Sequence, residues 1–178
     1  MILSPHFSLA ELSWTGHREI DNTVPPALLP ALIRTARGLE HVRILLGVPV
    51  IVLSGYRCAA LNCIVGGSMT RASLEVLLRT QGGGPALATA IQRMRERKYQ
   101  ETDSQHMRAE ACDFIAPRYG SPFNVCRLLE ASDLLFDQLI FEQGWVHASF
   151  IRIGDPRHTV LTYKDGIYSA GLTRSINL

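Results

Sequence analysis

The feature that most constrains the fold is an amphipathic stretch, residues 27–46, that follows two consecutive prolines. Its apolar residues recur at helical spacing, at Leu28, Leu32, Ala36, Leu39, Val42 and Leu46. This period places them on one face of a helix, and that face must pack against other apolar elements. We therefore predict a long helix over 27–46 that ends at Gly47 and Pro49 and helps to build a core.

The segments around this helix predict shorter elements. The sequence FSLAELSW, residues 7–14, is typical of a short helix that Ser8 caps, with Glu11 at the third helical position. The β-branched run PVIVLSGYR, residues 49–57, predicts a buried strand. Next, AALNCIVGG at 59–67 predicts a short helix or turn that ends at glycines.

From residue 110 onward the chain is rich in strand signals. A helix is predicted within this part at 121–132, with Ser121 as its cap and Pro122 at its first position. Strands are predicted over 110–117, 136–142 and 145–153, the last two around a tight Gln-Gly turn, and a hairpin over 158–169 with Asp165-Gly166 at its tip. Helices followed by antiparallel strands indicate an α+β domain, so we expect a small antiparallel sheet with helices packed around it.

Length and composition limit the classes of protein. The 178 residues suffice for one domain with a core, and 47% hydrophobic and 19% charged residues are typical of a folded protein. The first residues lack the pattern of a signal peptide, and no run reaches the roughly 18 to 20 apolar residues of a membrane span. We therefore expect a protein without a transmembrane segment that is made in the cytoplasm, with its four cysteines as reduced thiols.

A basic segment interrupts the middle of the chain. Between Arg71 and Lys98 there are six basic and two acidic residues, although the formal charge of the whole chain is only +2. Two helical stretches in this segment, 73–80 and 86–99, are divided by GGGP and predict a helical hairpin. Tyr99 is its only aromatic residue beside the basic ones and no groove-reading motif is present, so nucleic-acid binding is disfavoured.

The motif SQHMRAEACDF, residues 104–114, holds candidate metal ligands. His106 and Asp113 are seven positions apart, and a third candidate, His147, follows in GWVHASF. Hydrolytic zinc sites use three such protein ligands and keep the fourth position for a water molecule. Spacing alone leaves the alternative open that these are ordinary surface or core residues.

Three ordered motifs resemble those of the zinc D-Ala-D-Ala carboxypeptidase family, the M15 peptidases, in the branch that includes phage endolysins and small murein peptidases. The motifs are SGYR at 54–57, SQHMRAEACDF at 104–114 and FDQLIFEQGWVHASF at 136–150. FSLAELSW and IDNTVPP are also similar to the small M15 proteins. In such proteins GGS runs almost directly into SQH, so residues 69–103 are interpreted as an insertion within one domain, residues 1–178.

The resemblance implies a Zn²⁺ ion held by His106, Asp113 and His147 on the antiparallel sheet. It also implies that Arg57 points at the substrate carbonyl oxygen, where negative charge builds in the transition state. Arginine suits this task because it stays charged and offers a rigid fork of donors. The alternative for Arg57 is a surface salt bridge.

This chain departs from the family pattern at the general base. Many members carry an acid three residues before the last histidine, where this chain has Gly144. The nearest upstream acids are Glu142 and then Asp137. We predict Glu142 as the base, because the Gln143-Gly144 turn can bring a strand end over a metal on the next strand. The alternative is an exposed glutamate at a strand end.

Three further positions near the motif carry predictions. Ala109 stands where the family usually has glycine, and its methyl group costs stability if the backbone there has a positive φ. Cys112 alternates with Asp113 along a strand, so it should face the core. Ser104 either hydrogen-bonds the carboxylate of the substrate, as the resemblance implies, or caps the local turn.

The resemblance implies a zinc peptidase that cleaves an amide bond in peptidoglycan stem peptides. It is a D-Ala-D-Ala carboxypeptidase or a murein endopeptidase, and the resemblance suggests a phage lysis enzyme that reaches the wall once released. The basic residues at 71–98 would bind anionic wall polymer or a membrane surface, close as a lid, contact a partner protein or have no separate role. The alternative function is a non-catalytic wall-binding or phage structural module that keeps the fold.

Overall fold

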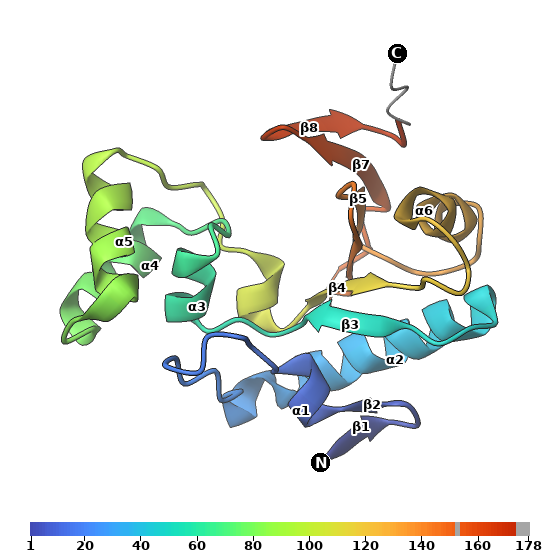
Figure 1. Cartoon of the computed structure of the whole chain (residues 1–178), viewed down its shortest axis with the longest axis horizontal. Coiled ribbons are helices and arrows are strands. Elements are labelled where there is room, and N and C mark those ends of the chain that lie inside the picture. The colour runs from blue at the N-terminus through green and yellow to red at the C-terminus, as the bar shows by residue number, and fades with distance from the viewer. Residues whose placement is uncertain (152–153, 174–178) are drawn as a thin grey trace.

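The structure of the chain, a computed structural model, describes residues 1–151 and 154–173. Within these residues, helices combine with a mixed sheet, so the predicted α+β class is confirmed (Figure 1). The helices are α1 (Leu9–Leu12), α2 (Leu29–Leu46), α3 (Ala59–Ile64), α4 (Arg71–Thr80), α5 (Gly84–Arg95) and α6 (Pro122–Glu130), with 3-10 turns η1 (Pro26–Leu28) and η2 (Gln105–Arg108). The strands are β1 (Ile2–Ser4), β2 (Phe7–Ser8), β3 (Ile51–Ser54), β4 (Ala111–Ile115), β5 (Gln138–Phe141), β6 (Val146–Ser149), β7 (Thr159–Lys164) and β8 (Ile167–Ala170).

The main sheet has the strand order β3-β4-β6-β5-β7-β8 within the described residues. Neighbouring strands are antiparallel except β5 and β7, which are parallel. The sequence predicted an antiparallel sheet, and this pair makes the sheet mixed instead. The parallel pair arises because the chain leaves β6, crosses past β5 and forms β7 along the other edge of β5. Part of the strand predicted at 145–153, residues 152–153, lies outside the described residues.

Strand β3 is an edge strand, and the prediction of a buried strand there was wrong. Ile51 and Leu53 are 48% and 39% exposed, and within the described part of the chain β3 pairs with β4 alone. A β-branched run is equally compatible with a central and an edge position, since its residues favour a pleated surface in either place.

Helix α2 covers one face of the sheet, as its apolar period predicts. Leu32, Leu39 and Val42 are fully buried in the main core, together with Cys112 and Phe114 from β4. The contact is close: a Cβ atom on Gly38 would lie 2.5 Å from the ring of Phe150. Since Cys112 faces this core, Asp113 faces the opposite side of β4, as predicted.

The predicted helix caps are present. Ser8 and Glu11 form a capping box at α1, and the Ser121 hydroxyl accepts a hydrogen bond from the Asn124 amide at the start of α6. The hairpin tip has positive φ at Asp165 and Gly166, as expected for an Asp-Gly turn. The small β1-β2 sheet was not predicted.

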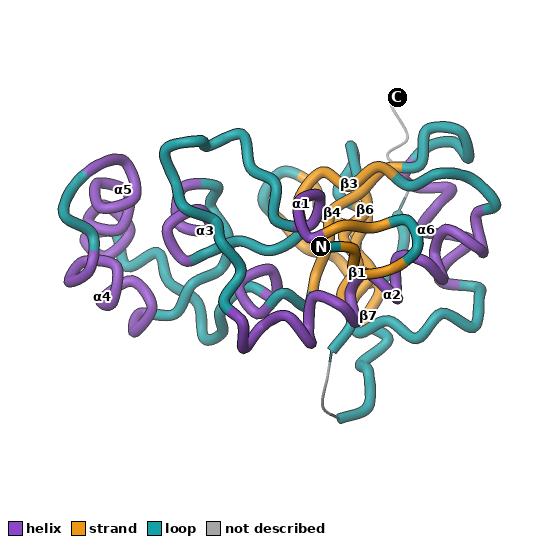
Figure 2. Tube along the Cα trace, turned by 90° about the horizontal axis from the view of Figure 1, so that it is seen from below, coloured by secondary structure: helices purple, strands orange, loops and turns teal. Residues whose placement is uncertain are grey.

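The segment predicted as a helical hairpin forms α4 and α5, which pack with α3 around a small core of their own. This core contains Cys63, Met69, Leu74, Leu77 and Ala90. In both views these helices lie to one side of the strands (Figures 1 and 2). We call residues 69–103 the hairpin lobe.

Much of the basic charge of the hairpin lobe is used internally. Arg71 and Arg79 pair with Glu75, and Lys98 pairs with Glu96. The Arg93 guanidinium donates to the carbonyl oxygen of Gly67 at 3.0 Å and thereby ties the lobe to the end of α3. None of the described helices is at once long and apolar enough to cross a membrane.

Candidate metal centre

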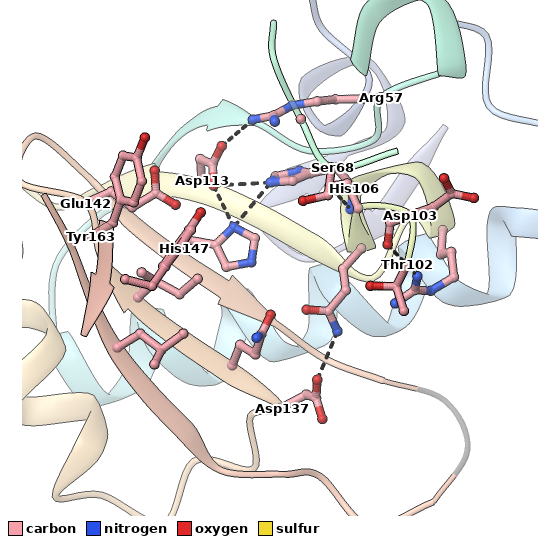
Figure 3. A pocket seen from close by; sticks show the side chains of 18 of the residues that line it. Arg57, Ser68, Thr102, Asp103, His106, Asp113, Asp137, Glu142, His147 and Tyr163 are labelled. Atoms are coloured by element: carbon pink, nitrogen blue, oxygen red, sulfur yellow. Dashed lines mark hydrogen bonds and ion pairs between the residues drawn. The ribbon is translucent and has the colours of Figure 1, made fainter. Parts of the chain in front are cut away.

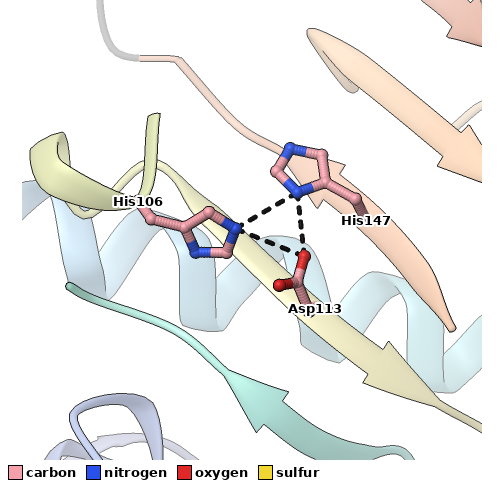
Figure 4. A group of neighbouring side chains, drawn as sticks. All are labelled: His106, Asp113 and His147. Carbon is pink, nitrogen blue, oxygen red and sulfur yellow. Dashed lines mark hydrogen bonds and ion pairs between the residues drawn. The ribbon is translucent and has the colours of Figure 1, made fainter. Parts of the chain in front are cut away.

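The three predicted ligands come together on the face of the sheet opposite α2 (Figure 4). His106 comes from η2, Asp113 from β4 and His147 from β6. The Oδ1 atom of Asp113 lies 2.9 Å from Nδ1 of His147 and 3.2 Å from Nε2 of His106. The two ring nitrogens are 3.2 Å apart. All three residues are buried, so their atoms could hold one metal ion.

The sheet register places two of the ligands. Asp113 on β4 lies directly opposite His147 on β6, so both side chains leave the same face as neighbours. The third ligand depends on the turn before β4, where Ala109 has a φ of 57° and reverses the chain. Ala109 therefore stands in the left-handed region, where its methyl group costs stability.

A backbone carbonyl orients the His106 ring. Its Nδ1 atom lies 2.6 Å from the carbonyl oxygen of Gly55. Because a carbonyl can only accept, Nδ1 carries the hydrogen and, in a neutral ring, Nε2 has a free lone pair. Burial lowers the pKa of His106, and this effect is larger than the opposing effect of the Asp113 charge. The His106 ring therefore stays neutral.

This tautomer makes the site suited to a cation. The lone pair of His106 Nε2 faces the Asp113 carboxylate oxygen at 3.2 Å, and both atoms are acceptors. A cation among the three side chains would turn this repulsion into attraction. Two imidazole nitrogens and one carboxylate oxygen form a ligand set typical of catalytic zinc sites, so the residues present fit zinc.

Arg57 lies beside the cluster rather than on the open surface. Its Nη2 group donates to the Oδ2 atom of Asp113, the carboxylate oxygen that does not face the histidines. Its Nε group donates to the Ser54 hydroxyl at 2.8 Å, and its side chain is only 16% exposed. The surface salt bridge considered for Arg57 is thus an internal ion pair next to the candidate metal ligands.

A family model described as Peptidase M15 matches residues 5–77, which is less than half of the chain. The match includes Arg57 and ends before the three candidate ligands. The match supports an assignment to the M15 peptidases. No curated protein matches the chain in a sequence comparison.

Glu142 follows the last residue of β5 and lines the cleft at the cluster. Figure 3 shows it beside Asp113 and Tyr163. The turn after it closes through a hydrogen bond from the Glu142 amide to the Trp145 carbonyl oxygen, 3.0 Å long. Burial raises the pKa of Glu142, and the charge of Asp113 raises it further, against the opposing effect of His147 and Arg57. Glu142 is therefore not the exposed strand-end glutamate of the alternative.

The cleft has a volume of about 870 Å³ and opens above the ligands. Tyr163 of the β7-β8 hairpin lines one side together with Glu142, while Ser68, Thr102 and Asp103 line the opposite side (Figure 3). Tyr168 of the same hairpin also lines the cleft. Ser68 immediately precedes the hairpin lobe, and Thr102 and Asp103 are its last two residues. The cleft is thus bounded on one side by the two ends of the segment that we interpreted as an insertion.

Ser104 and Asp137 have clear partners. The Ser104 hydroxyl accepts a hydrogen bond from the His106 amide at 3.3 Å, so it caps η2, and it also lines the cleft. Asp137 is 1% exposed and bound by Arg157 and Gln105. Because Arg157 and Gln105 both donate to its carboxylate, Asp137 is unsuited to act as the base.

Two parts of the site were missed by sequence reasoning. The Gly55 carbonyl carries no side-chain signal, although it lies within the SGYR motif. Arg157 and Gln105 were not singled out, because their pairing with Asp137 spans 20 and 32 positions and follows no local pattern.

Proposed function

We propose that this protein is a zinc-dependent peptidase that hydrolyses an amide bond in peptidoglycan stem peptides, with zinc held by His106, Asp113 and His147. The observation that carries the proposal is the convergence of three ligand atoms, each within 3.2 Å of the other two, on the floor of a cleft. The M15 match supports a metallopeptidase. The choice of peptidoglycan rests on the likeness of the three motifs to murein peptidases.

Zinc bound there would polarise the scissile carbonyl group and acidify a water molecule. The chain supplies the remaining functions. His106 keeps its Nε2 lone pair directed at the site through its hydrogen bond to Gly55. Asp113 is held by Arg57 from the side away from the histidines.

Arg57 would stabilise the negative charge that develops on the substrate oxygen. A guanidinium carries five N–H donors, and the contacts to Asp113 and Ser54 use two of them. Those contacts fix the direction of the fork, so its other donors are oriented before the substrate arrives. Such preorganised donors are commonly worth on the order of a hundredfold in rate or more.

Glu142 would take a proton from the attacking water and deliver it to the leaving nitrogen. A carboxylate with a raised pKa is suited to both steps. A pKa closer to the working pH lets the group take up a proton in one step and release it in the next. Its position at the end of β5 next to Asp113 brings it to the same part of the cleft as the ligands.

The test combines metal analysis with digestion of purified murein. Wild-type protein should contain about one zinc per chain and release peptide fragments that mass spectrometry identifies, which also shows which bond is cut. His106→Ala should lose both zinc and activity, whereas Glu142→Gln should keep zinc and lose activity. Arg95→Ala, in the hairpin lobe, serves as a control with both properties unchanged.

The alternative of a non-catalytic wall-binding module predicts a different result. Such a protein, loaded with zinc, would bind murein and release no fragments. Action on the wall after release from the cell, as in phage lysis, is part of our proposal and follows from the same resemblance.

A further inference from the structure

A second polar cluster lies in the cleft at the other end of β5. Asp137 immediately precedes this strand and Glu142 immediately follows it. Ile140, the β5 residue opposite His147, is three residues from Asp137, or roughly 10 Å of extended strand. The cluster therefore lies along the cleft from the metal ligands, at a distance that a peptide of two or three residues spans.

Arg157 is held in this cluster with its guanidinium oriented. Its Nε atom lies 3.1 Å and 3.0 Å from the two carboxylate oxygens of Asp137, and its Nη2 group also bonds Oδ2. The Arg157 backbone amide donates to Oδ1 at 3.0 Å. Asp137 is 1% exposed, whereas the Arg157 side chain is 54% exposed and lines the cleft. The buried carboxylate thus fixes one edge of the fork and leaves the other edge toward the cleft.

Gln105 adds an acceptor that has no partner. Its Nε2 group donates to the same Oδ2 atom of Asp137, at 2.9 Å, which fixes the amide orientation. Its Oε1 atom is buried and has no hydrogen-bond partner among the described residues, although Gln105 is only 7% exposed and lines the cleft. A buried acceptor without a donor is unfavourable, so a ligand that brings an N–H group would be favoured there.

The charge of the cleft favours an anionic ligand once a metal is bound. Among the residues that the structure describes, three arginines and four carboxylates line the cleft, and a divalent cation makes the sum of their charges positive. Arg57 binds Asp113 and is assigned above to the substrate oxygen, and Arg108 donates to Glu110 at 2.8 Å. Arg157 differs from these two in that a carboxylate only 1% exposed holds its fork while its own side chain is 54% exposed.

We propose that Arg157 and Gln105 form a subsite that binds a free carboxylate and a neighbouring N–H group of the peptide substrate. Arg157 binds the carboxylate and Gln105 Oε1 accepts from the N–H. This inference rests on the proposed peptidase function and deepens it, because it makes a carboxylate within about three residues of the cleaved bond a requirement of the substrate.

The test uses a stem pentapeptide, L-Ala-γ-D-Glu-L-Lys-D-Ala-D-Ala, in which the D-Glu is linked through its side-chain carboxyl group, in three forms. One has both carboxylates free, one is amidated at the C-terminus and one is amidated at the D-Glu α-carboxylate. Masking the carboxylate that occupies the subsite should lower kcat/KM of the wild type by about ten- to a hundredfold, as expected for a charged hydrogen-bonded pair. The form that is affected identifies which carboxylate is bound.

Arg157→Ala should hydrolyse all three forms at nearly the same rate, close to that of the wild type on the masked peptide. Arg157→Lys, which keeps the charge without the fork, should retain part of the preference. Arg108→Ala removes a charge from the same cleft and should keep the full preference. The proposal is overturned if masking has no effect on the wild type, or if Arg157→Ala lowers all forms equally and keeps their ratio.

A separate outcome is that no form is hydrolysed, which would count against the proposed function. Binding of the three forms to the zinc-loaded Glu142→Gln variant, followed by calorimetry, then decides the subsite. Tighter binding of the free carboxylate that disappears on Arg157→Ala supports it, and equal binding of all forms refutes it.

Discussion

The Nδ1 atom of His106 donates to the Gly55 carbonyl oxygen across 2.6 Å, and this contact links a candidate metal ligand to the SGYR motif. The same glycine touches helix α1: a Cβ atom on Gly55 would lie 2.3 Å from the Leu12 carbonyl oxygen. The ring of His106 is therefore oriented by a loop that itself has no room to shift toward α1.

Gly55→Ala should weaken zinc binding by about ten- to a hundredfold, the usual effect of losing a partner behind a metal ligand. The added methyl group must push the loop away from Leu12 and carry the carbonyl with it. Zinc affinity, measured by competition with a chelator, tests this without any activity assay. Gly82→Ala is the matched control, because nothing lies within 4 Å of a Cβ atom there.

Asn22→Asp should destabilise the fold by about 2 kcal/mol or more. The Asn22 Nδ2 group donates to the carbonyl oxygens of Ser13 and Tyr56, both at 2.9 Å, and its Oδ1 atom accepts from the Cys58 amide at 2.7 Å. These contacts hold the backbone on both sides of Arg57, and an aspartate would place a carboxylate against two carbonyls.

Urea unfolding measures the loss in Asn22→Asp, and kcat on murein peptides should fall along with it. Asn124→Asp, at an exposed position in the first turn of α6, is the control and should be neutral. Equal stability of Asn22→Asp and wild type would show that these hydrogen bonds do not hold the loop.

Asp137→Asn should lower stability at neutral pH by about 2 kcal/mol, since it removes the charge that Arg157 and Gln105 bind. Burial alone would raise the pKa of Asp137, but hydrogen bonds from Arg157 and Gln105 outweigh it, so the pKa is lowered on folding. A lowered folded pKa means that this contribution is complete above the unfolded pKa, about 3.9, and is lost as the pH falls through the folded value.

Urea unfolding of wild type and Asp137→Asn at a series of pH values checks this pH dependence. The difference between the two proteins should be constant from pH 7 to about 5 and should shrink below pH 4. A difference that stays constant down to pH 2 would contradict the assignment.

The pH profile of kcat/KM should show an acid limb above the ordinary glutamate pKa of 4.5, because Glu142 must be deprotonated to act as a base and its pKa is raised. Activity therefore falls as the pH drops through this raised value. Glu142→Gln should lose on the order of a hundredfold or more in kcat, and its residual activity should lack the limb. An unchanged limb in Glu142→Gln would assign it to another group.

The elements that sequence reasoning found are those specified by neighbouring residues. The Ser8 and Glu11 cap, the period of α2 and the Asp165-Gly166 turn each depend on residues a few positions apart. The proximity of Asp113 and His147 was expected from resemblance, and the β4-β6 register explains it.

What could not be predicted depends on contacts between distant segments. The exposure of β3 and the parallel β5-β7 pair follow from strand order, which no local pattern encodes. The Arg157 and Gln105 contacts to Asp137 likewise exist only after the sheet has formed. Ala109 is intermediate: its departure from the family pattern was visible, but its positive φ was not.

The separate core of the hairpin lobe makes it an exchangeable unit. Its apolar side chains close on one another and on α3, so a graft of a different loop between Ser68 and Ser104 would leave the contacts of α2 with the sheet intact. Because the two ends of the lobe form one wall of the cleft, such grafts offer a route to new substrate preferences with the metal ligands unchanged.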